Sequence, residues 1–269
     1  MVLVARTSRS VRARIATRGA AAVLGAGLAL GFAPSLAGAA TAKSWGGSRA
    51  SRQTAIVTQT TSTPTSTPAF TDGFGSIALG TSLAPGTATG AWMPVWNGFG
   101  TITRVTDVSP SLELQPATAT APTQTHSSLV TSVPAFGDST LSMSLRTVAQ
   151  LRQGSAPNPW ETGWALWHYS DNAHFYYVLL KPNGWELGKE DPAYPGNQRF
   201  LTTGSTPFAV GSWHMIQITQ VANTINVTAD GLPLTTFVDS ERPYLTGSIG
   251  LYCEDSQVHF SGISATGQL

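Results

Sequence analysis

Residues 213–238, WHMIQITQVANTINVTADGLPLTTFV, carry the pattern that decides the fold. Apolar residues recur at every second position around Ile216 and Ile218, and again at Ile225 and Val227, a period that predicts half-buried strands. We expect Trp213 to point into the core with Ile216 and Ile218. The tight-turn sequence Asp230-Gly231 contains a glycine that accepts a positive φ. The stretch therefore predicts an antiparallel meander over Trp213–Gln220, Thr224–Ala229 and Leu234–Val238.

The rest of the chain also has the sequence pattern of short strands separated by turns. No long window shows the three- and four-residue apolar spacing of a helix, and Gly, Pro, Ser, Thr or Asn interrupt the sequence about every 8 to 12 residues. Two packed antiparallel sheets would cover so many half-apolar faces, so we predict an all-β sandwich of roughly thirteen strands. The remaining predicted strands are Phe70–Leu79, Trp92–Trp96, Gly100–Val108, Leu112–Gln115, Ser127–Val133, Thr140–Val148, Trp164–Tyr169, His174–Lys181, Gly184–Leu187, Ser248–Glu254 and Gln257–Ile263.

The first 40 residues have the features of a secretory signal peptide. Basic residues from Arg6 to Arg18 precede the apolar run Ala20–Phe32, and the small residues 36–40 offer a cleavage site. The apolar run is shorter than the ~20 residues that span a bilayer. We therefore expect a secreted, extracellular protein with no membrane insertion after cleavage. Residues 41–68 are rich in Ser, Thr and Pro and predict a disordered linker, which leaves one domain over residues 69–269.

Charge and cysteine content limit the function classes. The formal net charge is +1, which gives no electrostatic case for binding nucleic acid. Cys253 is the one cysteine, so no intramolecular disulfide can form, and we expect it to be a buried structural thiol. We expect the protein to be a monomer.

Three segments carry a family resemblance: DNAHFYYVLLKPNGWELGK (171–189), GSWHMIQITQVANTINVTADGLPLTTFVD (211–239) and GSIGLYCEDSQVHFSGI (247–263). Together they resemble the C-terminal half of concanavalin A-like jelly rolls, of the laminin G and 3-keto-disaccharide-hydrolase type found in secreted bacterial proteins. The matching positions include Tyr176, Tyr177, Gly184, Trp213, Asp230, Gly231, Gly250, Tyr252, Glu254 and Phe260. The resemblance implies a two-sheet jelly roll. It leaves the activity open, because this fold serves lectins, hydrolases, lyases and adhesion modules.

Aromatic and ionisable residues gather between Trp160 and Phe200, which contains four of the eight tryptophans. Rings that stack on sugar C–H groups, with polar side chains for the hydroxyls, favour a module that binds a polysaccharide. We expect the open concave face to carry His174 and Tyr176, with Phe175 and Tyr177 in the core. The loop 188–199 is expected to complete the site. The predicted ligand-binding residues are Trp167, His174, Tyr176, Lys181, Trp185, Glu186, Lys189, Tyr194 and Arg199.

Two other functions remain open from the sequence. A polysaccharide-degrading lyase or glycoside hydrolase would use the same cleft, with catalytic candidates Glu186, Glu254, His174 and Tyr176, although the one-strand motif E-x-D-x-x-E of laminarinase-type enzymes is absent. A cell-envelope adhesion or structural module is the other alternative.

Calcium is the one cofactor that the sequence suggests, since this fold binds it through hard oxygen donors on loops. The weak candidates are Asp72 and Asp171, with Asn172 and Asp255 as further oxygen donors. No transition-metal site is predicted, because no two of the five histidines have a ligand spacing.

Overall fold

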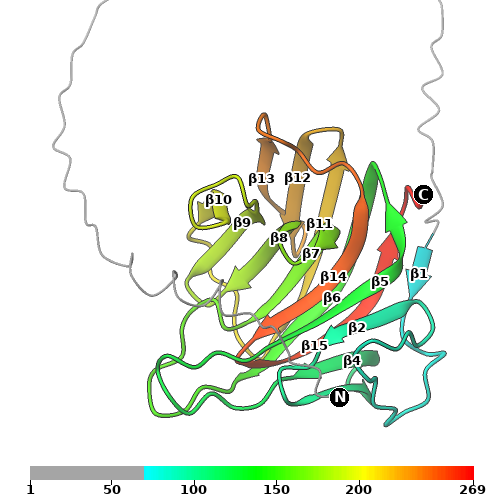
Figure 1. Cartoon of the computed structure of the whole chain (residues 1–269), viewed down its shortest axis with the longest axis vertical. Helices are drawn as coiled ribbons and strands as arrows, with labels where there is room; N and C mark the ends of the chain where they lie inside the picture. The colour runs from blue at the N-terminus through cyan, green and yellow to red at the C-terminus, as the bar shows by residue number, and fades with distance from the viewer. Residues whose placement is uncertain (1–69) are drawn as a thin grey trace, which may run out of the picture. The chain divides into compact units, whose positions relative to one another are not determined.

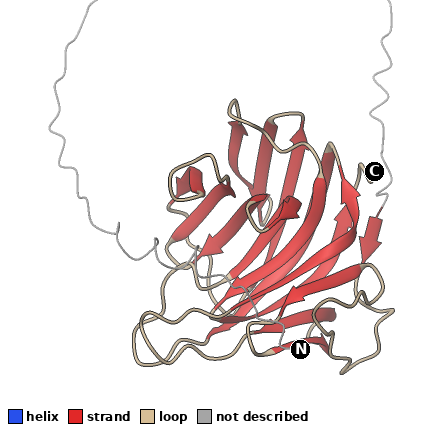
Figure 2. Cartoon of the chain, in the orientation of Figure 1, coloured by secondary structure: helices blue, strands red, loops and turns tan. Residues whose placement is uncertain are grey.

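The structure is a computed structural model that describes residues 70–269, and all regular elements in this range are strands (Figure 2). The predicted signal peptide over residues 1–40 and the predicted linker over 41–68 lie outside the described residues. Between residues 70 and 269 there is no helix with the length and apolar character needed to cross a membrane. The strands are β1 (Phe70–Asp72), β2 (Trp92–Trp96), β3 (Thr101–Thr106), β4 (Pro110–Gln115), β5 (Ser127–Phe136), β6 (Ser139–Gln150), β7 (Gly163–Asp171), β8 (His174–Lys181), β9 (Gly184–Glu190), β10 (Gln198–Gly204), β11 (Trp213–Val221), β12 (Thr224–Ala229), β13 (Leu232–Val238), β14 (Gly247–Glu254) and β15 (Ser256–Ala265).

These strands form two antiparallel sheets (Figure 1). The eight-stranded sheet has the order β13-β12-β11-β6-β15-β4-β3, with β1 paired to β15 outside this path. The seven-stranded sheet has the order β10-β9-β8-β7-β14-β5-β2. The chain changes sheets repeatedly, for example between β5 and β6 and between β14 and β15. The predicted all-β, two-sheet antiparallel sandwich is confirmed.

The core lies between the two sheets and follows the period of two. In β6, Leu141, Met143 and Leu145 are buried, while the residues between them point away from the core. Ile216 and Ile218 of β11 pack into the same cluster, and so does the buried thiol of Cys253. Burying such side chains contributes ~1.5–3 kcal/mol each. A strand with this alternation is therefore stable only where a second sheet covers its apolar side.

The predicted meander is confirmed as β11, β12 and β13. Ala229 pairs with Leu232, so the turn consists of two residues, Asp230 and Gly231. Both have positive φ, at 52° and 77°, which is the geometry that joins two twisted antiparallel strands most directly.

Two predicted segments differ from the structure. The first strand extends only over Phe70–Asp72 and not to Leu79. Where a long loop over residues 188–199 was expected, β9 continues to Glu190 and β10 begins at Gln198, so the loop is only 191–197. β10 is an edge strand with a register shift near Phe200, and its burial does not alternate regularly, which explains why the pattern missed it.

Candidate functional site

The outer face of the seven-stranded sheet carries an unusual number of rings. In β14, Ile249, Leu251 and Cys253 point into the core, so Tyr252 and Glu254 lie on the opposite side. The same alternation in β7 and β8 places apolar side chains on that outer side, where they form a second cluster apart from the main core. We call this surface the aromatic face. It consists of Leu129, Trp164, Leu166, Tyr177 and Leu179, with Val95, Trp96, Trp160, Tyr169, Phe175 and Tyr252 packed against them.

The rings of the aromatic face contact one another across several strands. The ring centroid of Trp164 lies 4.9 Å from that of Tyr177 on β8 and 5.3 Å from that of Tyr252 on β14. Tyr169 and Phe175 form a further pair at 5.8 Å near the tip of the β7–β8 hairpin. Trp164 and Tyr177 are buried, whereas Trp160, Phe175 and Tyr252 are half-exposed. The aromatic face is therefore apolar and closely packed at its centre, and the rings at its edge are partly open to solvent.

Hydrogen bonds hold two carboxylates on this face. Glu186 of β9 accepts from the hydroxyl of Tyr177 at 2.9 Å and from the ammonium of Lys181 at 3.0 Å. Gln198 donates to the same tyrosine hydroxyl at 3.0 Å. Glu254 accepts from the hydroxyl of Tyr252 at 2.6 Å. Because these bonds fix the carboxylates, their orientation does not depend on a ligand.

Glu190 differs from the other acids of this face. It lies on the same side of β9 as Glu186, and its side chain is nearly buried. Burial raises the pKa of Glu190 to about 8, with a smaller contribution from the charge of Glu254. The carboxyl group is therefore mostly protonated at neutral pH and can donate a hydrogen bond or a proton.

Glu186 and Glu254 lie on strands that are not neighbours in the sheet. Glu186 pairs with Leu179, which pairs with Trp164, which pairs with Tyr252. Three strand spacings of ~4.8 Å separate the outermost strands of this row by about 14 Å, and Glu254 lies two residues further along β14. The two acids of a glycoside hydrolase are ~5–9.5 Å apart. The strand register alone therefore does not place the two acids side by side, and the catalytic Glu186–Glu254 pair stays a prediction.

Four of the predicted ligand-binding residues point into the core: Trp167, Tyr176, Trp185 and Lys189. Trp167 and Tyr176 are 3% and 0% exposed, stack on each other at 5.2 Å and hydrogen-bond to Gln220 and Asp239. Trp185 is also a core residue. Our choice of the open face of β8 was wrong: Tyr176, Val178 and Leu180 face the core, and Phe175, Tyr177 and Leu179 face outward.

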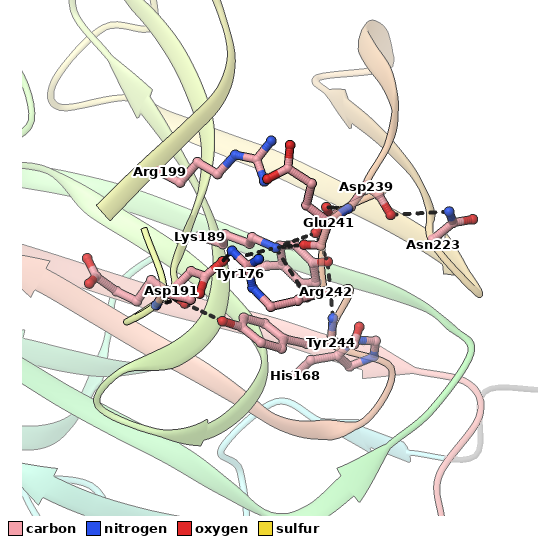
Figure 3. A network of polar contacts seen from close by, with 12 residues as sticks. His168, Tyr176, Lys189, Asp191, Arg199, Asn223, Asp239, Glu241, Arg242 and Tyr244 are labelled. Atoms are coloured by element: carbon pink, nitrogen blue, oxygen red, sulfur yellow. Dashed lines mark hydrogen bonds and ion pairs between the residues drawn. The ribbon is translucent and has the colours of Figure 1, made fainter. Parts of the chain in front are cut away.

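Lys189 is fully buried and belongs to a polar network, not to a surface site (Figure 3). Its ammonium donates to Asp239 at 2.7 Å and to the backbone carbonyls of Glu241 and Arg242. The network thereby fastens the segment between β13 and β14 to β9. Because its ammonium is buried and bonded within this network, Lys189 is not on the surface that a polysaccharide would contact.

The other predicted residues lie at different edges of the seven-stranded sheet. Lys181 and Glu186 are on the aromatic face. His174 is bonded to Asp171 at the tip of the β7–β8 hairpin. The guanidinium of Arg199 lies over the ring of Tyr194 at 5.8 Å and forms an ion pair with Glu241. The expected single site therefore divides, and only Lys181, Glu186 and Glu254 lie beside the aromatic cluster.

Sequence reasoning missed most of the aromatic face, including Trp96, Trp160, Trp164, Tyr177, Glu190 and Tyr252. One signal was available: Ile249, Leu251 and Cys253 are clearly the inward side of β14, which leaves Tyr252 and Glu254 outward. β7 and β8 gave no such signal, because both of their faces are apolar.

The predicted calcium ligands do not fit a metal. Asp72 accepts from the backbone N–H of Phe74 and the indole of Trp92, and Asp171 accepts from His174 and Ala173. Asp255 is bonded to Arg152. Within residues 70–269 no group of three or more His, Cys, Asp or Glu side chains is placed to hold a metal ion.

No family model matches the chain, and no curated protein matches its sequence. Among solved structures, an endo-acting O-glycanase of the human gut microbiota, of those that initiate mucin breakdown, superimposes with a TM-score of 0.51 at 10% identity, covering 74% of this chain and 99% of its own. The carbohydrate-binding module CBM66 from Bacillus subtilis gives a TM-score of 0.49 at 13% identity, covering 66% and 96%. With the two antiparallel sheets, the similarity to the O-glycanase shows that the fold is a concanavalin A-like jelly roll. At such an identity it shows the fold alone.

Proposed function

We propose that the protein is an exported carbohydrate-binding module that holds a polysaccharide on its aromatic face. The observation that supports this proposal best is a cluster of half-exposed rings on the outside of a sheet, separate from the core. Apolar side chains that remain partly open to solvent and lie together on one face are typical of a binding surface. A sugar ring offers C–H groups to such a platform and hydroxyls to the acids beside it.

The polar groups of the aromatic face suit a neutral polysaccharide. Glu186 and Glu254 are held as acceptors by tyrosine hydroxyls, and the protonated Glu190 adds a donor. Preorganised acceptors and rings bind with less loss of side-chain entropy than mobile ones. One solved structure of the same fold is an endo-acting O-glycanase, which agrees with a glycan as ligand.

The proposal is tested by binding the full chain to an array of polysaccharides and repeating the measurement with Phe175→Ala and Trp160→Ala. Each substitution removes a half-exposed ring, and we expect binding of the preferred glycan to weaken roughly tenfold, or ~1.4 kcal/mol. The matched control is Met215→Ala, which shortens an exposed apolar side chain on the other sheet. Unchanged binding by both ring variants would contradict the proposal.

A second candidate function is cleavage of the polysaccharide, and Glu190 is the observation that favours it. A general acid must hold a proton at the working pH, and burial provides this for Glu190. Assays for reducing ends and for unsaturated uronates on the same samples decide between the candidates. If Glu190 is the acid, product formation falls as the pH rises through about 8 and is lost in Glu190→Gln. Binding without product leaves the module as the function.

A further inference from the structure

A pocket lies on the side of the sandwich opposite the aromatic face, on the outer face of the eight-stranded sheet. Its volume is about 710 Å³, within the ~300–1,000 Å³ typical of small-molecule sites. The lining combines the β1–β2 connection, the β3–β4 turn and outward residues of β6, β11 and β15: Gly73, Gly75, Val108, Ser109, Pro110, Ser144, Trp213, Ser261 and Gly262. The expectation that Trp213 is a core residue was wrong. Ile216 and Ile218 point inward, so Trp213, at odd spacing from them, points outward.

Glycines keep one side of this pocket open. A Cβ at Gly73, Gly75 or Gly262 would meet no atom within 4 Å, so each of these positions borders free space. Gly262 has a φ of 58° and lies where the pairing of β15 with β6 shifts register between Ser261 and Ser264. The irregularity interrupts the sheet surface beside the serines.

Beside the pocket, a row of outward side chains crosses four strands: Trp213 pairs with Arg146, Arg146 with His259, and His259 with Glu113. Asp107, from the β3–β4 turn, accepts from both Arg146 at 2.8 Å and His259 at 2.9 Å. Glu113 accepts from the other ring nitrogen of His259 at 2.9 Å. The two carboxylates balance the guanidinium and the imidazolium, so the row has no excess charge to attract an ion.

Two donors in this row lack an acceptor. The indole Nε1 of Trp213 and the Nε of Arg146 are both buried, and among residues 70–269 no hydrogen-bond acceptor is within reach of either. Buried N–H groups are normally satisfied, so the indole N–H of Trp213, which lines the pocket, favours a molecule that brings an oxygen. An indole ring with an unpaired N–H and the hydroxyl of Ser144 are groups that contact an uncharged, oxygen-rich ring. The hydroxyls of Ser109 and Ser261 are bonded to each other, and that of Ser261 also donates to the carbonyl of Pro110.

We propose that this pocket is a second saccharide site, which binds one or two neutral sugar rings on the side of the domain opposite the aromatic face. A charged ligand is disfavoured because Arg146 and His259 are already neutralised. A purely apolar ligand would leave the indole N–H of Trp213 unpaired. With two sites on opposite faces, the protein would bridge two glycan chains, and it would bind a network of such chains more tightly than either site binds alone.

The test is ligand-observed NMR on the full chain, with glucose, galactose, mannose and N-acetylglucosamine as neutral probes and glucuronate as the anionic one. Ser144→Leu fills the pocket, and Ser142→Leu is the matched control, two residues away on the same outward side of β6. We expect at least one neutral probe to bind, with its Kd raised tenfold or more by Ser144→Leu and less than twofold by Ser142→Leu. Phe175→Ala, on the aromatic face, should leave this Kd unchanged, which separates the two sites.

Three results would overturn the proposal: no neutral probe binds, a neutral probe binds equally well to Ser144→Leu and wild type, or glucuronate binds more tightly than every neutral probe. If Ser144→Leu does not fold, Gly75→Leu replaces it, because a side chain there enters free space. An unchanged Kd in the folded Gly75→Leu variant would contradict the site as well.

Discussion

Replacing Lys189 with methionine tests whether the buried network fixes the segment that joins the two sheets. The ammonium of Lys189 and the carboxylate of Asp239 are both fully buried and 2.7 Å apart. Asp239 Oδ2 also accepts from Tyr176 at 2.6 Å, and Oδ1 accepts from the backbone N–H of Glu241. Lys189→Met keeps most of the side-chain volume and removes the charge and three donors.

The expected loss of stability follows from what remains in the site. Asp239 keeps two neutral donors and loses its cation, and removing one partner of a buried ion pair typically costs ~3–5 kcal/mol. The backbone carbonyls of Glu241 and Arg242 lose their donor as well. Because a domain of this size is stable by only ~5–15 kcal/mol, urea unfolding followed by tryptophan fluorescence should show a large shift of the midpoint.

The control for this experiment is Arg199→Met, which breaks a partly exposed ion pair with Glu241. Such pairs contribute ~0–1 kcal/mol, so this variant should unfold close to wild type. In a Lys189→Met, Asp239→Asn double variant the unpaired charge is gone, and we expect part of the loss to be recovered. A loss below ~1 kcal/mol in Lys189→Met, or no recovery in the double variant, would refute the reasoning.

Two further predictions concern pH and packing. Burial lowers the pKa of His259, but its hydrogen bonds to Glu113 and Asp107 outweigh this effect and raise that pKa above 6.5. The same hydrogen bonds lower the pKa of both carboxyl groups. The contribution of His259 to stability is therefore fully present below pH 6.5 and is lost as the pH rises through its raised pKa, whereas that of the carboxylates is lost as the pH falls through their lowered pKa values. Urea midpoints measured between pH 4 and 9 should fall as the pH rises from 6.5 through the raised pKa, in addition to the fall that the raised pKa of Glu190 causes up to about pH 8. The fall should be smaller in His259→Gln, and an equal fall in this variant and in wild type would contradict the assignment. Gly188→Ala would place a Cβ 2.2 Å from the Tyr177 hydroxyl, so we expect a loss of about 1–3 kcal/mol in thermal unfolding together with weaker glycan binding. Gly75→Ala is its control for thermal unfolding alone, and equal melting temperatures for the two variants would show that Tyr177 is not packed against β9.

Much of the fold could be predicted because its signals are local. Alternation in residues 140–148 and 213–229 located β6, β11 and β12, and Asp230-Gly231 located a turn that has the expected positive φ. The candidate site was predicted less well. Lys181, Glu186 and Glu254 do lie on the outer face of the seven-stranded sheet, but Trp167, Tyr176, Trp185 and Lys189 were assigned to the wrong side.

The wrong assignments on β7 and β8 arose because these strands are apolar on both faces. In β8, Tyr176 and Val178 on one side and Tyr177 and Leu179 on the other have the same hydrophobic character, so a period of two gives no direction. A partner distant in sequence decides it: Asp239, which lies 63 residues from Tyr176 and 50 from Lys189, bonds to both on the inner side. On the outer side, Glu186 of the neighbouring strand accepts from the hydroxyl of Tyr177. The sequence by itself determined where the strands and turns lie and that they form a two-sheet sandwich. Only the tertiary structure decided which side of each strand is core, because that choice depends on contacts between strands far apart in the chain.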